Sequence, residues 1–248
     1  MAVVGFFQGI ADAFLVLIRY IVKLAPIGVF ALAVSLAARM GAAAAGVLAF
    51  YIALLSAIAA AFIVLVLYPA AVLFGRVRLS RFVRAAAPAQ AVTFASQSSL
   101  AALPAVYEGV RTVLALPEDV YDLFLPLAAS MFRVGGPMVQ VVGVLFLAKL
   151  YGVALSSGQF ATITVMAVVT SMTIPGVPGG GVIVMAPVLT MMNLPVAGIG
   201  ILLAVDTIPD MFRSTANVTG WLCVLSILSR DAAATSKVAK QSVAGEEA

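Results

Sequence analysis

The chain contains no histidine, a single cysteine and few charged residues, and each shortage excludes a class of function. Without histidine there is no His-based metal site, general base or proton relay. The lone Cys223 lies in an apolar run, so no disulfide framework can form within the chain. Charged residues are 10% of the chain, against about 25% in ordinary soluble domains, and 64% of the residues are hydrophobic. This composition is that of a membrane protein.

The basic residues indicate membrane topology and not a nucleic-acid partner, because they form no stripe with interleaved aromatics. Four arginines gather between residues 76 and 84. A solvated charge run would explain them, but the positive-inside rule favours a cytoplasmic loop at 76–84. We therefore expect a multi-pass protein of the inner cell membrane, with this loop and the C-terminus in the cytoplasm.

Alternation of apolar stretches and breaks predicts an all-α membrane protein. Two stretches are interrupted by polar or flexible residues, Ser96–Ser99 before Pro104, and the Gly/Pro-rich run 175–181. Such breaks are tolerated in a bilayer only where they are buried in protein or line a cavity. Paired interrupted segments are typical of secondary transporters with inverted repeats and a midplane site.

The expected segments follow from this pattern. They are a scaffold-like span with an interfacial start (1–42), a span with the basic loop (43–84), a first re-entrant hairpin (85–117), a broken span (118–152), a second re-entrant hairpin (153–194), a substrate-binding span (195–230) and a disordered tail (231–248).

Charged residues in the second half lie where a membrane protein tolerates them least. A charge at the centre of a bilayer costs at least about 2.5–3.5 kcal/mol, and retained charges usually mark a substrate or ion path. Besides Arg133, they include Asp206, Asp210 and Arg213, which with Asn217 are spaced i, i+4, i+7 and i+11. That spacing predicts one polar stripe on one helix. The alternative is an Asp–Arg pair that only neutralises itself inside the bundle.

From about residue 25 to residue 220 the chain resembles the dicarboxylate/amino acid:cation symporters, the glutamate transporter homologues. The motifs that carry the resemblance are Ala25-Pro-Ile-Gly-Val-Phe-Ala31, the Ser-rich tip before Leu103-Pro104, Leu125-Pro126-Leu127, Gly176-Val-Pro-Gly-Gly-Gly181, and Asp206-x3-Asp210-x2-Arg213-Ser214-x2-Asn217-Val218-Thr219-Gly220. The resemblance implies an inverted-repeat transport domain, elevator-type alternating access and a homotrimer in the full-length form. It begins at the family's fifth span, so we expect a truncated or partial chain.

The resemblance also assigns substrate-binding roles. It implies that Ser98 and Ser99 hold the substrate α-carboxylate, that the tip with Val177 and Gly179 closes over the substrate, that Asp210 binds the α-amino group, that Arg213 binds a side-chain carboxylate, and that Ser214 and Asn217 bind the α-carboxylate or amine. The chemistry agrees, because a guanidinium fork suits carboxylates and an aspartate suits an ammonium group. Serines that only pack between helices are the alternative for the first tip.

The broken span departs from the sodium-coupled members of the family. Where they carry Asn-Met-Asp-Gly-Thr, this chain has Phe132, Arg133, Val134, Gly135 and Gly136, and a further Asp is replaced by Trp221. Hard cations need oxygen ligands, so sodium is not expected there. A site made mainly of backbone carbonyls near the second hairpin stays open. We expect no cofactor or metal, and we expect Gly136, in place of Thr, to widen the pocket.

Arg133 suggests how the missing cation is replaced. A guanidinium keeps its proton, and Arg133 and Arg213 balance Asp206 and Asp210 without any ion. The hypothesis is that Arg133 is a tethered, charge-balancing cation mimic, with Asp206 as its counterpart. The alternative is a structural pairing of Arg133 with Asp206 or with a carbonyl. Asp206 or Asp210 could carry a proton.

The sequence thus predicts a secondary active or facilitative transporter of aspartate or glutamate, sodium-independent, whose partners are the acidic amino acid and the lipid bilayer. A C4-dicarboxylate carrier and a non-transporting binding or sensor protein are the alternatives. No nucleophile–base pair is evident, so we do not expect an enzyme.

Overall fold

The computed structural model describes residues 43–174 and 178–246, with isolated positions between residues 5 and 38. Over these residues all regular structure is helical. The elements are α2 (Ala43–Phe62), the π-helical turn η1 (Ile63–Leu67), α3 (Tyr68–Leu73), α4 (Leu79–Ser96), α5 (Leu103–Glu108), the π-helical turn η2 (Gly109–Leu114), α6 (Glu118–Met131), α7 (Gly135–Leu150), α8 (Ser157–Ser171), α9 (Gly180–Ile183), α10 (Ala186–Met191), α11 (Gly198–Val205) and α12 (Thr207–Glu246). The expected span 1–42 and the gate residue Val177 lie outside the described residues.

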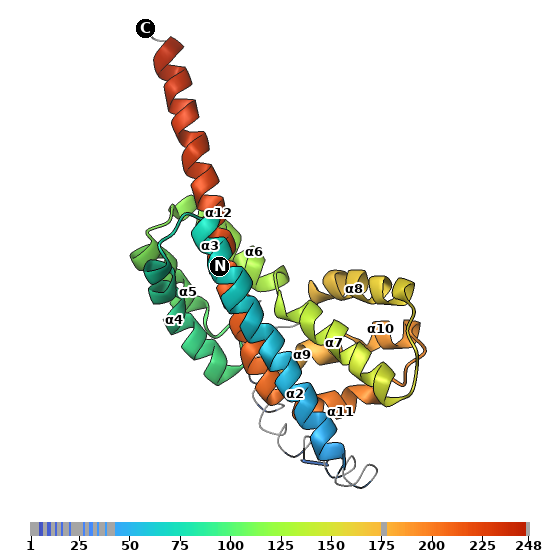
Figure 1. Cartoon of the computed structure of the whole chain (residues 1–248). Coiled ribbons are helices and arrows are strands. Elements are labelled where there is room, and N and C mark those ends of the chain that lie inside the picture. Colours follow the sequence, from blue (N-terminus) through green and yellow to red (C-terminus); the bar gives the residue numbers. More distant parts are fainter. Residues whose placement is uncertain are drawn as a thin grey trace.

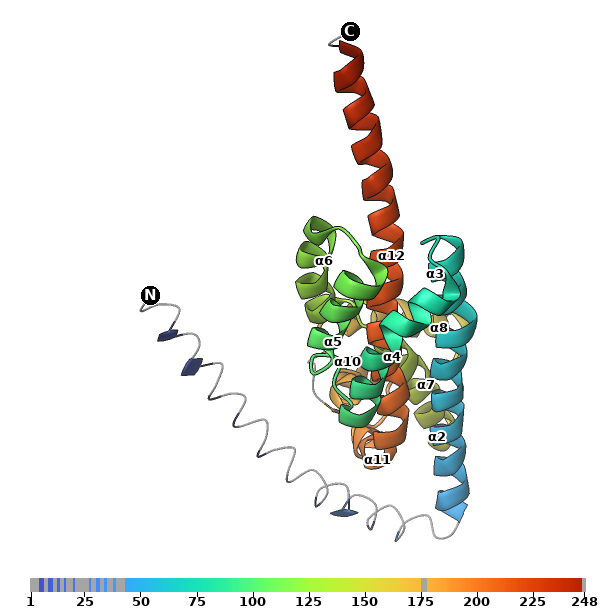
Figure 2. The same cartoon turned by 90° about the vertical axis from the view of Figure 1, so that its left-hand side faces the viewer.

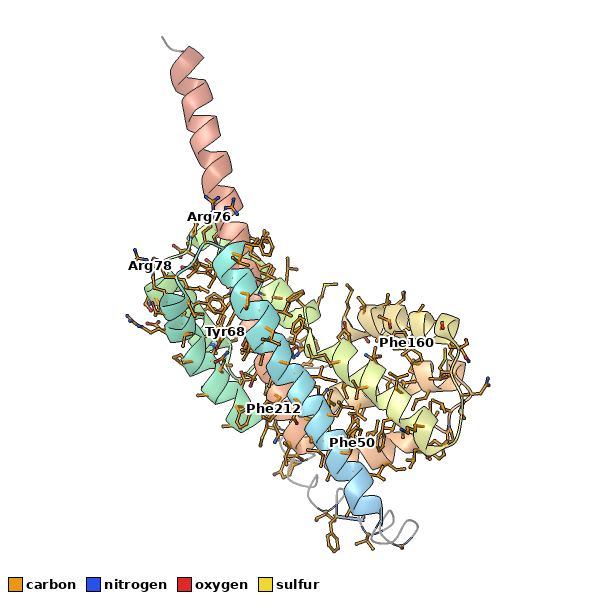
Figure 3. All side chains as sticks on the ribbon, viewed as in Figure 1. Phe50, Tyr68, Arg76, Arg78, Phe160 and Phe212 are labelled. Carbon is orange, nitrogen blue, oxygen red and sulfur yellow. The ribbon has the colours of Figure 1, made fainter. Side chains whose placement is uncertain are left out.

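Within the described residues, two stretches are long and apolar enough to cross a membrane, Ala45–Leu73 and Glu118–Leu150. The first joins α2, η1 and α3 into one rod that runs beside α12 (Figure 1). Tyr68, Arg76 and Arg78 lie toward one end of this rod and Phe50 toward the other (Figure 3). The two arginines therefore mark the end of the bundle from which α12 extends.

Two helical hairpins lie on opposite sides of the α2–α12 pair (Figure 1). The first is α4 returning through α5 and η2, and its core contains Phe82, Leu125 and Trp221. Its arms pack closely because Gly109 has no side chain: an added Cβ would lie 2.6 Å from the Ala85 carbonyl oxygen. The second hairpin is α8 returning through α9 and α10, within a separate core built around α7. The structure thus places a helix–turn–helix unit at each of the two predicted hairpins.

The first hairpin begins earlier than expected. We placed Arg81 and Arg84 in the basic loop, whereas α4 starts at Leu79 and includes both. Arg81 Nη2 donates to the carbonyl oxygens of Val113 (2.8 Å) and Leu114 (3.3 Å) at the end of η2. A cation at the C-terminal end of a helix satisfies carbonyls that lack an intrahelical partner. Arg81 therefore ties the start of one arm to the end of the other.

The two later spans differ in detail from the expected segments. The chain leaves helical geometry at Phe132 (φ −93°, ψ 95°) and resumes at Gly135, so Gly135 and Gly136 lie in the first turn of α7. The expected single span 195–230 is divided into α11 and α12 at Asp206. The polar stripe survives the division, because the amide of Asp210 donates to the Asp206 carbonyl at 2.8 Å.

Helix α12 continues to Glu246, where we expected a disordered tail. No proline occurs after residue 209, and the segment 231–242 contains four alanines, a residue with high helix propensity. Figures 1 and 2 show this last part projecting away from the other helices. The length of α12 beyond the bundle therefore rests on local propensity and not on packing.

Candidate functional site

The tip of the first hairpin is turned inward by a left-handed residue. Gln97 follows α4 with φ 56° and ψ 22°, and its amide still donates to the Thr93 carbonyl at 2.8 Å. The reversal buries Ser99, which is 2% exposed. Ser98 is oriented differently, because its Oγ accepts from the amide of Ala101 at 3.3 Å within the tip.

The break between α6 and α7 carries Arg133, which is 7% exposed. Its Nη1 donates to Ser99 Oγ at 2.9 Å and its Nη2 to the Ala129 carbonyl oxygen at 2.8 Å. Its Nε has no hydrogen-bond partner. Among the described residues, no carboxylate oxygen lies within 4 Å of this guanidinium. Arg133 is thus a buried cation bonded only to neutral groups.

The start of α12 carries a tight group of three charges. Arg213 Nη2 donates to both oxygens of Asp206, at 2.8 and 2.7 Å, and to Asp210 Oδ1 at 3.0 Å. Asp210 also accepts from the hydroxyl of Ser214 at 3.4 Å. A buried ion pair is most stable when hydrogen bonds satisfy all of its remaining polar atoms. Here one atom is not satisfied, because Arg213 Nε has no hydrogen-bond partner. The three side chains together carry one net negative charge.

The second hairpin contributes two glycines that contact the charged group of α12. Gly179 adopts φ 74°, a left-handed conformation that favours glycine, and its amide donates to Asp210 Oδ2 at 3.2 Å. Gly181 lies directly against Arg213, because an added Cβ would be 2.8 Å from Nη1. Both glycines therefore bring the main chain of the second tip onto the charged group of α12.

These elements enclose one cavity. It is lined by Gln97, Ser99, Arg133, Gly135, Gly136, Ile174, Gly181, Asp210, Arg213, Ser214 and Asn217. The space open to a water-sized sphere is about 20 Å³, room for a single water molecule. The cavity is lined by the guanidinium groups of Arg133 and Arg213, the carboxylate of Asp210 and hydroxyl groups. Both hairpins also contribute to its walls. Such a set can bind a small molecule that carries both signs of charge, once the tips separate.

Most of the predicted binding residues meet at this cavity, namely Ser99, Arg133, Asp210, Arg213, Ser214 and Asn217. Gly179 contacts Asp210 from just outside it. Asp206 is behind the lining, where it binds Arg213, and Ser98 does not line the cavity. The alternative pairing of Arg133 with Asp206 is not observed, whereas the pairing with a carbonyl is.

The expectation that Gly136 widens the pocket is wrong. An added Cβ at Gly136 would lie 2.5 Å from Ile174 Cδ1 and 2.8 Å from Ser171 Cβ. The space is therefore filled from the second hairpin. Sequence reasoning also missed Gln97, Ile174 and Gly181 as lining residues. Gln97 and Gly181 adjoin predicted tip residues, but an apolar residue such as Ile174 gave no signal.

The broken span is held to α12 by two further hydrogen bonds. The indole Nε1 of Trp221 donates to the Phe132 carbonyl oxygen at 2.7 Å. The amide of Gly135 donates to Asn217 Oδ1 at 2.8 Å. The Phe132 carbonyl and the Gly135 amide thus each have a side-chain partner from α12. One lone pair of the Phe132 carbonyl oxygen therefore accepts from an indole N–H.

The chain was compared with proteins of known family. The model of the Sodium:dicarboxylate symporter family matches residues 1–231. The proton/sodium-glutamate symport protein of Geobacillus stearothermophilus is 28% identical over 228 residues, which are 92% of this chain and 54% of the relative. Neutral amino acid transporter B(0) of Mus musculus is 31% identical over 223 residues, 88% of this chain and 40% of the relative.

A third relative, neutral amino acid transporter A of Homo sapiens, is 35% identical over 130 residues, 52% of this chain and 24% of the relative. The chain spans about half the length, or less, of these relatives. The match to the family model nonetheless covers nearly the whole chain, including both hairpins and every residue of the cavity. The chain belongs to the sodium:dicarboxylate symporter family of membrane transporters, and not to a family of enzymes.

Proposed function

We propose that the chain is the substrate-binding transport domain of a membrane carrier for acidic amino acids, with aspartate and glutamate as substrates. The observation that carries the proposal is the single cavity where Asp210, Arg213 and Arg133 meet between two hairpin tips. Asp210 is the partner for the α-ammonium group, and Arg213 is the partner for a side-chain carboxylate. Relatives named as glutamate symport proteins support the substrate class.

The hairpins are re-entrant in this proposal, and the second tip is the gate. The cavity admits about one water molecule, so an amino acid can enter only if Ile174 and Gly181 move away from Arg133 and Arg213. Gly179 in its left-handed conformation suits a loop that must change its φ and ψ angles. Rigid-body sliding of this domain against a scaffold, in a homotrimer, would complete an elevator-type cycle.

The carrier is sodium-independent in this proposal, although relatives are named proton/sodium-glutamate symport proteins. The residues of the break do not fit a sodium ion, because the side chains of Phe132 and Val134 offer no oxygen ligand. Trp221, which stands where an acidic ligand is expected, instead donates to the Phe132 carbonyl. Arg133 supplies a fixed positive charge in place of a bound cation.

Calorimetric titration of L-aspartate and L-glutamate into the detergent-purified chain tests this proposal, with choline chloride replacing all sodium. Binding that is unchanged on adding sodium supports a sodium-free carrier. Binding that appears only with sodium contradicts it. Counterflow of labelled aspartate in liposomes then separates transport from binding alone.

A C4-dicarboxylate is the second candidate, because Arg133 and Arg213 together offer two cationic groups to the cavity. A dicarboxylate without an amine would offer Asp210 no ammonium partner beyond the contacts it already has with Arg213, Ser214 and the Gly179 amide. Competition of succinate against labelled aspartate decides between them: displacement by succinate at similar concentration favours the dicarboxylate.

A further inference from the structure

Arg133 is a buried cation with no carboxylate oxygen of the described residues within 4 Å of it. Arg213, in the same cavity, has oxygens of two carboxylates within 3.0 Å. Arg133 has only the Ser99 hydroxyl, the Ala129 carbonyl and an Nε without a partner. Taking a charge out of water costs several kcal/mol unless an opposite charge compensates it. Arg133 is therefore the group in the cavity with the most to gain from an incoming anion.

The position of Arg133 identifies which anion. Its Nη1 lies 2.9 Å from Ser99 Oγ, so a carboxylate that reaches the first hairpin tip meets the guanidinium and the hydroxyl together. Asp210 lines the same cavity but lies beyond 4 Å from Arg133, so the two unlike charges stay apart. One cationic and one anionic wall across a small cavity match the two charges of an amino acid zwitterion.

We propose that Arg133 binds the substrate α-carboxylate directly, together with Ser99, while Asp210 binds the α-ammonium group. This inference rests on the proposed function and extends it, because a cation mimic would balance charge without touching the substrate. The side-chain carboxylate of aspartate is left to Arg213, whose Nη1 faces Gly181. Arg133 thus selects for the part that all α-amino acids share, and Arg213 for the part that distinguishes acidic ones.

Three ligands distinguish binding of the α-carboxylate from binding of the side-chain carboxylate. Each is titrated without sodium into the full chain in detergent. L-aspartate has both carboxylates, L-asparagine keeps only the α-carboxylate, and L-isoasparagine, the α-amide, keeps only the side-chain carboxylate. With Arg133→Met, affinity for aspartate and for asparagine should each fall about 10- to 150-fold, the value of a charge-assisted hydrogen bond. Affinity for isoasparagine should change by about twofold or less, because that ligand has no α-carboxylate to lose.

Two further variants control for misfolding and for charge. Ser99→Ala keeps the guanidinium and removes its hydroxyl partner, so it should show the same ligand pattern at smaller amplitude. Arg111→Met removes an exposed arginine of η2 that pairs with Glu108 at 3.8 Å. It should leave all three affinities unchanged.

Equal losses for all three ligands with Arg133→Met would overturn the inference and leave Arg133 as a charge-balancing group only. A loss for aspartate and isoasparagine without one for asparagine would also overturn it, by assigning Arg133 to the side-chain carboxylate. Failure of the unmodified chain to bind any of the three ligands would instead contradict the proposed function itself.

Discussion

Trp221 donates its indole N–H to the main-chain carbonyl of Phe132, 89 residues earlier in the chain, at a distance of 2.7 Å. The bond joins the middle of α12 to the break between α6 and α7. It is partly buried: the side chain of Trp221 has no exposed surface, whereas Phe132 is about one-third exposed. The Phe132 carbonyl, which a bound cation could otherwise contact, here accepts a hydrogen bond from the Trp221 side chain. The bond therefore ties the break to α12.

Replacing Trp221 with phenylalanine should destabilise the fold measurably. The substitution removes the indole donor from the partly buried Phe132 carbonyl, which costs about 0.5–1.5 kcal/mol, the net value of a typical hydrogen bond. Thermal unfolding in detergent, with and without sodium, checks this, and added sodium should not restore the lost stability. Phe82→Leu is the matched control, because it reduces a fully buried side chain of the same core without removing a hydrogen bond. A loss no larger than that of the control would mean that the bond contributes little.

The contact of Gly135 with Arg213 gives a second prediction. In Gly135→Ala the added Cβ would lie 2.7 Å from the main-chain oxygen of Arg213 and 2.9 Å from its Cβ. Backbone must move to relieve this, and overpacking of this kind costs about 1–3 kcal/mol. Because Arg133 lies in the break just before Gly135, aspartate affinity should fall as well.

Gly220→Ala is the control for that experiment. It lies on α12 and faces the same break, but its added Cβ would be 3.4 Å from a side-chain carbon of Phe132, an ordinary contact. Calorimetric titration and thermal unfolding of both variants should show normal behaviour for Gly220→Ala and impaired behaviour for Gly135→Ala. Similar results for the two would show that α7 and α12 can separate at no cost.

How much of this site the sequence could predict depends on whether a residue's role is local. The stripe of Asp206, Asp210 and Arg213 follows from helical spacing, and the structure brings all three within hydrogen-bond distance. The two hairpins follow from their polar and glycine-rich interruptions. These features depend on near neighbours in the chain, and sequence alone contains them.

The partners of Arg133 and the filling of the pocket depend instead on packing between distant segments. Ser99 and Arg133 are 34 residues apart, and either a carboxylate or a hydroxyl could have stood opposite the guanidinium. Ile174 fills the space beside Gly136 because the second hairpin tip is placed there by the core around Met185. Volume in a packed interior is set by all neighbours together, so a single small residue does not reveal a cavity.

Removing Arg213 should be far more costly than removing an exposed arginine. Arg213→Met leaves Asp206 and Asp210 buried beside each other without a cation, and breaking a buried pair in this way costs about 3–5 kcal/mol. Arg111→Met breaks an exposed pair with Glu108, which contributes at most about 1 kcal/mol. Chemical unfolding in mixed detergent micelles compares the two. Equal effects would mean that Asp206 and Asp210 accommodate the loss, for example by taking up a proton.

If the closed site must stay electrically neutral, acidic substrates should bind together with a proton. Arg133, Arg213, Asp206 and Asp210 sum to zero, so a neutral zwitterion such as asparagine leaves the closed site neutral. Aspartate adds one negative charge, and an uncompensated buried charge costs several kcal/mol. We therefore expect about one proton to be taken up with each aspartate and none with asparagine, so that aspartate affinity falls as pH rises.

Titrations in two buffers of different ionisation enthalpy measure this proton count directly. Asp206→Asn supplies the decisive variant, because it raises the charge sum of the empty site to plus one while keeping the shape of the side chain. Aspartate then neutralises the site by itself, so its proton uptake should fall to about zero and its affinity should lose most of its pH dependence. Proton uptake that is the same for aspartate and asparagine, or that persists in Asp206→Asn, would show that the four charges do not act as one neutral set.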